Sequence, residues 1–341
     1  MHNMARACFI ATDGPVVMFD FPCSEHLSEH LDLVDEIRGV TAFYYWEVSY
    51  HAPEFARKFA RDITELMNTH CERGRRIAVD KMEIDGVRAF DDLGLEIGNG
   101  QEIMVHARSI KNENELNAMR CALAASEAAV AEMHAVLRPG MTEVELWSHL
   151  HRGNIRRGGE WIETRMLSSG PRTNPWHQEC GPRVIQQGDI VAFDTDLIGP
   201  YGYCADFSRT WVCGDVRPSN AQQTLFELAR DCLNHHIEIL QPGRSFRELS
   251  EHSFRTPPLY VKNRYGCTHH GVGLCDEYPL ILHHDDYDQI GYDGILEPGM
   301  VVSAEAYIGA ENGHEGVKLE DQLVITENGC ENLTSYPVNL K

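Results

Sequence analysis

Five acidic side chains and one histidine stand at or near the ends of apolar, strand-like segments, where they could hold a metal ion. They form two groups along the chain: Asp194, Asp196 and Asp206, then His270, Glu305 and Glu320. A carboxylate that ends an apolar strand is costly to bury unless it is paired or bound to a cation. One imidazole among carboxylate oxygens suits Mn, Fe, Co or Zn, and bridging carboxylates hold two such ions about 3.5 Å apart. The pattern predicts a site for one or two divalent ions, although any single acid could equally be an independent surface or hydrogen-bonded residue.

A glycine-containing turn separates the acids of the first group. Gly199-Pro200 and Gly202 predict a hairpin between Asp196 and Asp206, so that acids at its two ends can meet across adjacent strands. The histidine of the second group lies in the glycine-rich segment 269–273. We therefore expect the two groups to approach each other only if the strands that carry them pack together.

Two repeated patterns indicate a duplicated α+β unit that would bring the groups together. Segments 137–146 and 240–249 each predict a helix, a Pro-Gly stop and a second helix, and Thr142 with Glu145 predicts a capping box. Segments 185–194 and 296–305 each predict a turn followed by a buried strand that ends in an acid. Short patterns recur by chance, but two in matching order favour a repeat. Halves related by a pseudo-twofold axis would bring Asp194 close to Glu305.

The chain is long enough for two domains, with 341 residues of which 43% are hydrophobic. Residues 1–111 predict a small α/β domain that opens with a hairpin, with strands at 7–12 and 15–21 joined by Asp13-Gly14. Because the chain starts within this sheet, we expect that domain to be incomplete at its N-terminus. A polar stretch at 109–114 precedes a long helical pattern, which predicts a catalytic domain at 112–341.

Composition excludes several classes of function. The formal charge of −22 would repel a phosphate backbone, so nucleic-acid binding is not expected. No apolar run reaches the roughly 18 residues of a spanning helix, and the apolar patch at 7–11 is too short for a signal sequence. The eleven cysteines are odd in number and include no Cys-x-x-Cys pair, which argues against disulfides and thiolate zinc sites. We expect a cytoplasmic protein in which most cysteines are buried apolar residues.

From about residue 112 onward the chain resembles the pita-bread fold of methionine aminopeptidase, prolidase and creatinase. The motifs that carry the resemblance are Arg138-Pro-Gly-Met-Thr-Glu143, Ser169-Gly170, Asp206-Phe-Ser-Arg-Thr210, His270-Gly-Val-Gly273, Glu297-Pro-Gly299 and Glu320-Asp321. The resemblance implies an α+β pita-bread fold with duplicated halves, preceded by part of a creatinase-type α/β domain. It also implies metal ligation by Asp194 or Asp196, together with Asp206 and the second group. His177 occupies the position of a second active-site histidine, which implies that it lines the cleft; it could also be an ordinary loop histidine.

The chain departs from the peptidases after the metal-binding histidine. Peptidases carry a later His-Glu pair there, whereas this chain is one residue shorter and has Asp276 in place of the imidazole. An ionised carboxylate accepts a proton, while an imidazole can donate to an oxyanion, so proton abstraction followed by elimination becomes the favoured chemistry. The three aspartates and Asp276 are similar to those of the DddP-type dimethylsulfoniopropionate lyases. That branch implies six iron ligands, Asp276 as the general base and Tyr265 as a substrate contact; otherwise Asp276 is a solvated loop acid and Tyr265 a half-buried tyrosine.

Three functions follow from these features. The first is a metal-dependent carbon–sulfur lyase that cleaves dimethylsulfoniopropionate, a small zwitterion, to dimethyl sulfide and acrylate by β-elimination. The second is a Xaa-Pro aminopeptidase or related amidohydrolase, in which a metal-bridged water attacks a carbonyl. The third is a binding protein that keeps the pita-bread shell without catalysis. The resemblance also implies a homodimer, and no membrane partner is expected.

Overall fold

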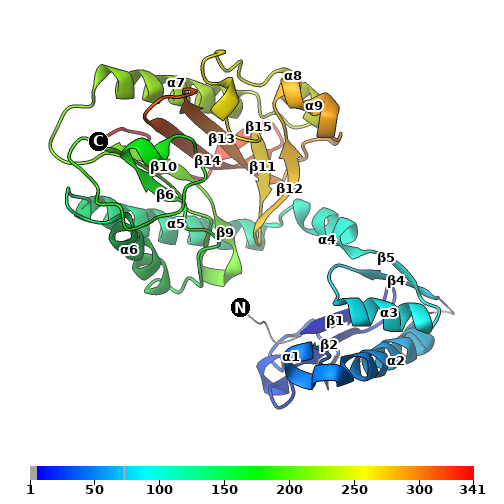
Figure 1. Ribbon diagram of the computed structural model, residues 1–341. Helices are drawn as coiled ribbons and strands as arrows, with labels where there is room; N and C mark the ends of the chain where they lie inside the picture. The colour runs from blue at the N-terminus through cyan, green and yellow to red at the C-terminus, as the bar shows by residue number, and fades with distance from the viewer. Residues whose placement is uncertain (1–5, 72–73) are drawn as a thin grey trace. The chain divides into compact units, whose positions relative to one another are not determined.

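The computed structural model describes residues 6–71 and 74–341, which fall into two compact units (Figure 1). The first unit is Met1–Met104 and the second is Val105–Lys341. The sequence placed the boundary slightly later, at 111/112. Helix α4 (Gly100–Ser109) runs across the division between the units. That the first unit is part of a creatinase-type domain stays a prediction.

The first unit is a small α/β structure that begins with a β-hairpin. β1 (Ala7–Ile10) pairs antiparallel with β2 (Val16–Asp20), and β3 (Glu36–Gly39) pairs in parallel with β2. Helix α2 (Ala52–His70) buries Phe59 in a core that also contains Phe19 and Phe90. The remaining elements are η1 (Glu25–Leu27), α1 (Tyr45–Val48), η2 (Ser49–His51), β4 (Arg76–Val79), α3 (Ile84–Asp92) and β5 (Glu96–Asn99).

The second unit contains two halves built in the same order, a helix pair followed by strands. The first half is α5 (Glu113–Val136), α6 (Glu143–Ile155), β6 (Leu167–Ser169), η3 (Gly170–Thr173), β7 (Ile190–Asp194), β8 (Leu197–Ile198), η4 (Pro200–Gly202), β9 (Cys204–Ala205) and β10 (Ser208–Val212). The second half is α7 (Asn220–Glu238), α8 (Phe246–Glu251), η5 (Val261–Asn263), β11 (His269–Val272), β12 (Asp276–Ile281), α9 (His284–Ile290), β13 (Val301–Gly309), β14 (Gly316–Thr326) and β15 (Gly329–Asn332). This order agrees with the predicted repeat.

The second helix of each pair starts at a capping residue, but only one of the two caps is complete. Ser245 and Glu248 form both hydrogen bonds of a capping box at the start of α8. At the start of α6, Thr142 accepts a hydrogen bond from the Glu145 backbone, but the Glu145 carboxylate lies 3.7 Å from Arg138 Nη2. The predicted capping box at Thr142 is therefore half formed, because the glutamate has an arginine partner nearby.

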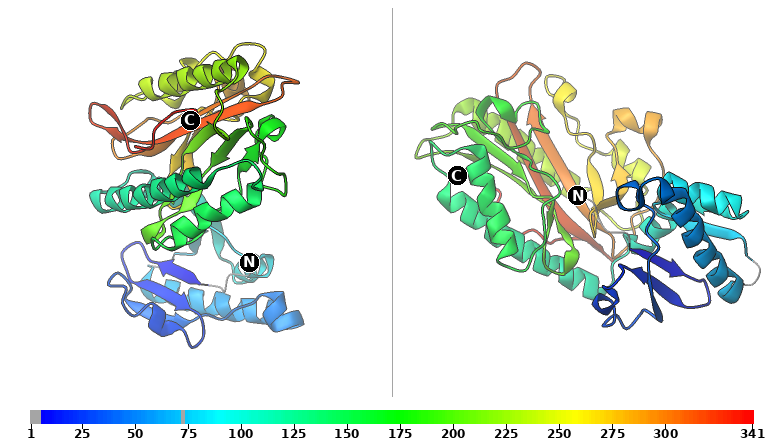
Figure 2. Two further views of the ribbon diagram at one scale, coloured as in Figure 1. Left: turned by 90° about the vertical axis from the view of Figure 1, so that its left-hand side faces the viewer. Right: turned by 60° about the horizontal axis from the view of Figure 1, so that its bottom comes forward.

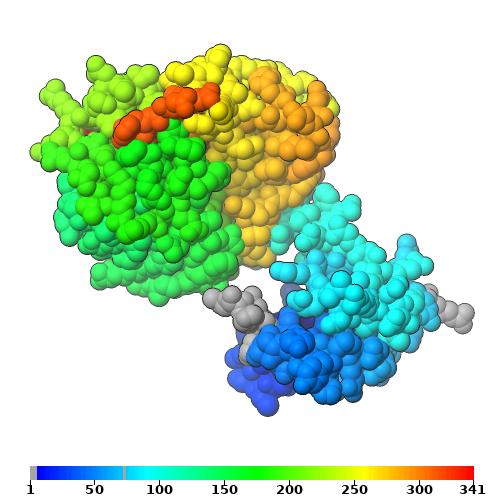
Figure 3. Space-filling view, in the orientation of Figure 1, coloured from blue at the N-terminus to red at the C-terminus, as the bar shows by residue number. Residues whose placement is uncertain are grey.

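Apart from the short β8–β9 pair, the strands of the second unit form two antiparallel sheets that meet between β10 and β14. Their orders are β10-β7-β6 and β12-β11-β13-β14-β15. The Thr210 hydroxyl joins the sheets, since it donates to the Lys318 carbonyl at 2.7 Å and accepts from the Lys318 amide at 3.1 Å. Figure 2 shows the layers from α7, across β13 and β14 and the first-half strands, to α5 and α6. On the face in Figure 3, red-orange atoms whose colour matches the turn between β13 and β14 emerge between the green and yellow segments.

The position of Glu305 differs from the prediction. Asp194 is the last residue of β7, as expected, but β13 continues past Glu305 to Gly309. β13 pairs with β14 over its whole length, from Val301 opposite Val324 to Gly309 opposite Gly316. The acid does not end the strand because the partner strand supplies hydrogen bonds on both sides of it.

Cysteines and hydropathy give two further results. All eleven cysteines are free in the described residues, but only five of them are buried, so the expectation that most are core residues is wrong. Among the described helices, none offers a stretch of the length and hydropathy needed to cross a bilayer.

Candidate metal centre

The hairpin between β7 and β10 brings the three aspartates of the first group together. Asp194 lies opposite Ser208 in the β7–β10 ladder, and the chain between them returns through the short β8–β9 pair. One carboxylate oxygen from each of Asp194, Asp196 and Asp206 lies within 4.8 Å of the others. All three residues are buried. The acids thus meet where the sequence expected them to.

The second group forms on the neighbouring sheet and joins the first. Glu305 on β13 faces Glu320 on β14 in the strand register, and His270 on β11 completes a cluster whose ligand atoms lie within 4.8 Å. His270 Nε2 lies 3.2 Å from Glu305 Oε1 and 3.5 Å from Asp206 Oδ2. The structure therefore gathers all six predicted ligands around one region, while their role as ligands stays a prediction.

Asp194 and Asp196 lie in the same cluster but have different partners. Asp194 Oδ1 accepts hydrogen bonds from Ser208 Oγ at 2.6 Å and from the Thr195 amide at 3.1 Å. Asp196 Oδ2 accepts from the hydroxyl of Thr164. Each carboxylate keeps one oxygen that is not used in these bonds. The sequence left open which of the two aspartates would serve as ligand, and this arrangement suits both.

A buried lysine lies among the carboxylates, and the sequence did not single it out. Lys318 is fully buried, and its Nζ lies at ion-pair distance from three ligand candidates: Asp194 Oδ2 at 3.0 Å, Glu305 Oε2 at 2.7 Å and Glu320 Oε2 at 2.7 Å. Side chains two residues apart on a strand share a face, so the Lys318-x-Glu320 spacing was an available signal. Lys318 supplies one permanent positive charge to the cluster.

The electrostatics of the cluster call for further positive charge. Burial, together with the charge of Glu320, raises the pKa of Asp194 and of Asp206 well above the usual range. Burial and the repulsion of Asp276 raise the pKa of Asp196 to about 7. Like charges held this close in a region of low polarity disfavour ionisation unless a cation is added.

The residues present fit a divalent metal. Asp206 Oδ1 is buried and makes no hydrogen bond with the described residues, and Glu320 Oε1, also buried without a hydrogen bond, has the His270 Nε2 atom at 3.5 Å. Buried carboxylate oxygens without donors are costly unless a cation binds them. The six predicted ligands supply one imidazole and five carboxylates, a donor set that suits Mn, Fe, Co or Zn, and a carboxylate oxygen of Asp276 also lies within 4.8 Å of ligand atoms of Asp206 and His270. These side chains could therefore hold a metal ion.

The backbone of this centre is held by two buried histidines that the sequence analysis did not consider. The Nδ1 of His236 on α7 lies 2.7 Å from the Glu305 carbonyl, and its Nε2 accepts from the Phe254 amide at 3.2 Å. The carbonyl of His236 is 3.0 Å from Nε2 of His269, the neighbour of His270. Burial lowers the pKa of both His236 and His269 to about 3, so both are neutral. Helix α7 thus ties together the two strands that carry Glu305 and His270.

Asp276 lies beside the ligand cluster and remains accessible. Its Oδ1 is 3.9 Å from His270 Nδ1, and its side chain is 47% exposed, whereas that of His270 is 9% exposed. Burial raises the pKa of the Asp276 carboxyl above its usual value, while His270 opposes the rise. A carboxylate with a raised pKa is a stronger base. The geometry places a proton acceptor next to the candidate metal centre, at a point that solvent reaches.

Tyr265 and His177 lie next to each other near the same charges. Their ring centroids are 5.3 Å apart, and Lys318 Nζ lies 4.7 Å from the centre of the Tyr265 ring. The loop that carries His177 is anchored by Asn174, whose amide donates to the Ala310 carbonyl at 2.8 Å. The structure therefore places Tyr265 beside the lysine of the cluster and His177 against Tyr265, and the functional roles of both remain predictions.

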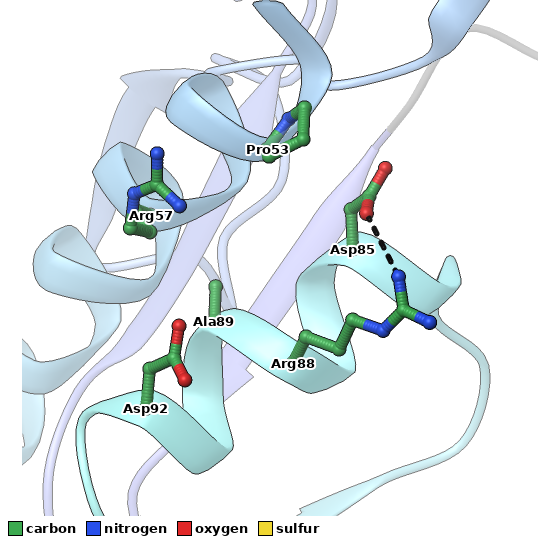
Figure 4. Close-up of a pocket in the computed structure, with 6 residues that line it drawn as sticks. All are labelled: Pro53, Arg57, Asp85, Arg88, Ala89 and Asp92. Carbon is green, nitrogen blue, oxygen red and sulfur yellow. Dashed lines mark ion pairs between the residues drawn. The ribbon is translucent and has the colours of Figure 1, made fainter.

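A separate pocket lies between α2 and α3 in the first unit (Figure 4). It is lined by Pro53, Arg57, Asp85, Arg88, Ala89 and Asp92. Arg88 Nη1 lies 3.9 Å from Asp85 Oδ1, so two of the charges that line the pocket are paired with each other on α3. The pocket contains none of the predicted site residues.

The chain is similar to known proteins in its family, its sequence and its structure. Residues 117–327 match the model of metallopeptidase family M24. The chain is 45% identical to the dimethylsulfoniopropionate lyase DddP of Roseovarius nubinhibens and to that of Roseobacter denitrificans, over 98% of this chain and 76% of each relative. The solved structure of a Xaa-Pro dipeptidase from Bacillus anthracis superposes with a TM-score of 0.81 at 22% identity, covering 100% of this chain and 90% of that one.

These findings agree with the repeat and with the two-layered arrangement of strands and helices. The likeness to the Bacillus anthracis structure establishes the fold, at an identity too low to carry an activity. The match of the family model covers more than half of the chain and spans the six ligand candidates. The chain belongs to metallopeptidase family M24 and has its pita-bread fold.

Proposed function

We propose that this protein is a dimethylsulfoniopropionate lyase that releases dimethyl sulfide and acrylate by β-elimination. The observation that carries the proposal is the 45% identity to two such lyases, which extends over 98% of the chain and so includes both units. The position of Asp276 supports it, because a half-exposed carboxylate beside the ligand cluster suits proton abstraction better than peptide hydrolysis.

The reaction needs one base and one leaving group. Asp276 takes a proton from the carbon next to the substrate carboxylate and becomes a carboxylic acid. The electron pair of that C–H bond forms the C=C bond of acrylate, while the C–S bond breaks and its electrons leave with sulfur. Because the sulfonium departs as neutral dimethyl sulfide, no general acid has to protonate it. Asp276 then returns its proton to solvent, which its exposure permits.

The six ligand candidates would hold the metal at the closed side of the site. One or two divalent ions, bound there, would supply the positive charge that holds the substrate carboxylate and stabilises the charge developing at the reacting carbon. Five ligand carboxylates and Lys318 carry −5 and +1, a net charge of −4, which favours two ions. We propose iron as the metal, as the resemblance to the lyase branch implies.

The cationic end of the substrate requires a binding surface different from the one that holds its carboxylate. Tyr265 and His177 present adjacent rings, and Asp276 contributes a negative charge. Aromatic faces and carboxylates attract a sulfonium through cation–π and Coulomb interactions. In this arrangement the substrate carboxylate lies toward the metal-binding acids, and the sulfonium lies toward the His177 and Tyr265 rings on the side away from Lys318, whose ammonium is 4.7 Å from the Tyr265 ring centre.

The test compares lyase and peptidase activity on one sample. Protein purified without oxygen and loaded with iron should release dimethyl sulfide, detected by gas chromatography, and should not cleave a Xaa-Pro dipeptide. Replacement of Asp276 by Asn or Ala should lower the rate by about 10²–10⁴-fold with an unchanged metal content, because a general base contributes that much. Arg120→Gln, at an exposed ion pair with Glu331, is the matched control and should retain full activity.

Each opposing result has a defined meaning. Wild-type protein that releases no dimethyl sulfide, or an Asp276→Ala variant with wild-type activity, would refute the lyase. Release of the N-terminal residue from Xaa-Pro substrates would instead favour an aminopeptidase. Elemental analysis that finds no transition metal after anaerobic purification would favour the non-catalytic binding protein.

The cellular setting is also part of the proposal. Eleven free cysteines in the described residues support a reducing compartment, and we propose the cytoplasm. We further propose a homodimer, as the resemblance to the family implies. Light scattering coupled to gel filtration measures the dimer directly, and a mass equal to one chain would contradict it.

A further inference from the structure

A buried group of three charges lies one residue away from the proposed base. The Glu277 side chain is 1% exposed, and both of its oxygens face a cation. Lys111 Nζ lies 2.6 Å from Oε1, and Arg108 Nε lies 2.8 Å from Oε2. Lys111 is as deeply buried as Glu277, whereas Arg108 is 30% exposed. We call Arg108, Lys111 and Glu277 the charge clamp.

The two cations come from a segment far from Glu277 in sequence that is fixed independently. Lys111 donates its backbone N–H to the Gly299 carbonyl at 2.9 Å, and its Nζ also reaches the Ser109 carbonyl at 3.3 Å. The clamp therefore ties β12 to the chain that precedes α5 and to the turn before β13. A buried carboxylate paired on both oxygens has little freedom to rotate, because a move away from either partner leaves a charge unpaired.

Strand geometry transmits this constraint to the base. Consecutive side chains on a strand point to opposite faces, so fixing Glu277 on one face of β12 fixes the direction of Asp276 on the other. The Glu277 carboxylate lies directly against the hairpin, since a Cβ on Gly273 would come 2.2 Å from Oε1. Arg108 Nη2 is 3.8 Å from Cys275 Sγ, on the other side of Asp276. Of the two chain neighbours of Asp276, Glu277 belongs to the charge clamp and Cys275 contacts its Arg108.

We propose that Arg108 and Lys111 are positioning residues for the elimination: through Glu277 they hold the carboxylate of Asp276 at its place beside His270. The proposal rests on the function assigned to Asp276 above. It assigns a catalytic consequence to charges that touch neither the substrate nor the candidate ligands.

The kinetic test uses Asp276 as a reference. Lys111→Met is expected to lower kcat by about 10–100-fold, because a displacement of the order of 1 Å at a reacting group costs that much, with KM within about threefold and the metal content unchanged. In the Asp276→Ala background the same substitution should cause no further loss. Lys111→Arg should recover most of the rate, and Arg120→Gln should match wild type. Equal losses in both backgrounds would overturn the proposal, because the clamp would then act on the fold or the metal.

A second measurement does not depend on lyase activity. Hydrogen–deuterium exchange of peptides spanning 271–281 should be faster in Lys111→Met than in wild type, while peptides within β13 and β14 keep their wild-type rates. Arg108→Gln, which removes the more exposed partner, gives a milder version if Lys111→Met does not fold. Unchanged exchange at 271–281 would overturn the clamp even if wild-type protein were inactive toward dimethylsulfoniopropionate. Faster exchange with unchanged kcat would overturn its catalytic role.

Discussion

Replacement of Lys318 by Met is expected to destabilise the metal-free protein much more than the metal-loaded protein. The lysine ammonium lies 2.7–3.0 Å from three carboxylates and is fully buried. At such distances and an effective dielectric constant of 20, each attraction is about 6 kcal/mol, and desolvation of the charges cancels much of the sum. Removal of one partner from a buried charged pair costs about 3–5 kcal/mol, and we expect a loss in that range.

The expected loss can be measured as a melting temperature. For a unit the size of Val105–Lys341, each kcal/mol corresponds to about 2–4 °C, so chelator-treated Lys318→Met should melt roughly 6–20 °C below wild type. Divalent ions would supply most of the missing positive charge, so the difference should shrink to less than half after loading with iron. Differential scanning calorimetry of both forms at one protein concentration gives the two differences.

Two variants distinguish charge from volume and from general damage. Lys318→Arg retains the charge and should lose less stability than Lys318→Met. Lys262→Met is the same substitution at an exposed ion pair with Glu311, and we expect no measurable change in melting temperature. A metal-free Lys318→Met protein that melts within about 2 °C of wild type would refute the reasoning, because the carboxylates would then not depend on the lysine.

Further predictions concern the contact of Tyr265 with the substrate, the loop that carries His177, the stability of the protein at acidic pH and the metal. Tyr265→Ala should raise KM about tenfold while Tyr265→Phe changes it little, since the ring supplies the cation–π wall; steady-state kinetics measures both, and equal KM values would contradict this contact. Asn174→Ala should lower the unfolding free energy by about 2–3 kcal/mol in urea, because the amide bonds the Ala310 carbonyl and other loop groups. Burial lowers the pKa of His236 to about 3 and that of His283 to about 4, so on acidification both histidines gain a proton at a higher pH in the unfolded chain than in the folded protein. Their contribution to the free energy of unfolding is therefore complete above pH 6.5 and is lost as the pH falls toward the pKa values of the folded protein. At pH 5 each of these two histidines should lower the free energy of unfolding by about 2 kcal/mol relative to pH 7. The His236→Gln variant should therefore lose correspondingly less stability than wild type between pH 7 and pH 5, and identical losses in the two proteins would contradict the assignment. Dialysis against a chelator should abolish dimethyl sulfide release, and added Fe²⁺ should restore it.

The parts of the fold that follow from local signals were predictable from the sequence. The N-terminal hairpin, the helix at 113–136 and the Pro-Gly stops depend on turn residues, periodicity and caps that lie within a few residues of each other. The two acid groups were found for a similar reason, because an acid at the end of an apolar strand is unusual in itself. Predicting that the two groups meet required the repeat, which is a pattern of the whole chain.

The parts that were missed depend on contacts between distant residues. Lys318 looks like an ordinary strand residue until the strand is found to be buried on both faces, next to Asp194. Lys111 and Glu277 are 166 positions apart, and no local pattern connects them. The end of β13 was misplaced because strand length is set by the partner strand, which the sequence of β13 does not contain.

The relation between this fold and its chemistry depends on the tip of one hairpin. The likeness to a Xaa-Pro dipeptidase shows that the shell is shared with peptidases, and the six ligand candidates belong to that shell. The predicted difference lies in the segment after His270, where the β11–β12 hairpin presents the carboxylate of Asp276. The ladder shifts register between His270 and Gly271, so Asp276 pairs with Val272 and its Oδ1 comes within 3.9 Å of the His270 ring. Under the function proposed above, an ionised carboxylate at that point would accept a carbon-bound proton from the substrate, whereas it could not donate to a peptide oxyanion. The proposed change from hydrolysis to elimination would then require a local change at the hairpin and no change in the strands that carry the ligand candidates.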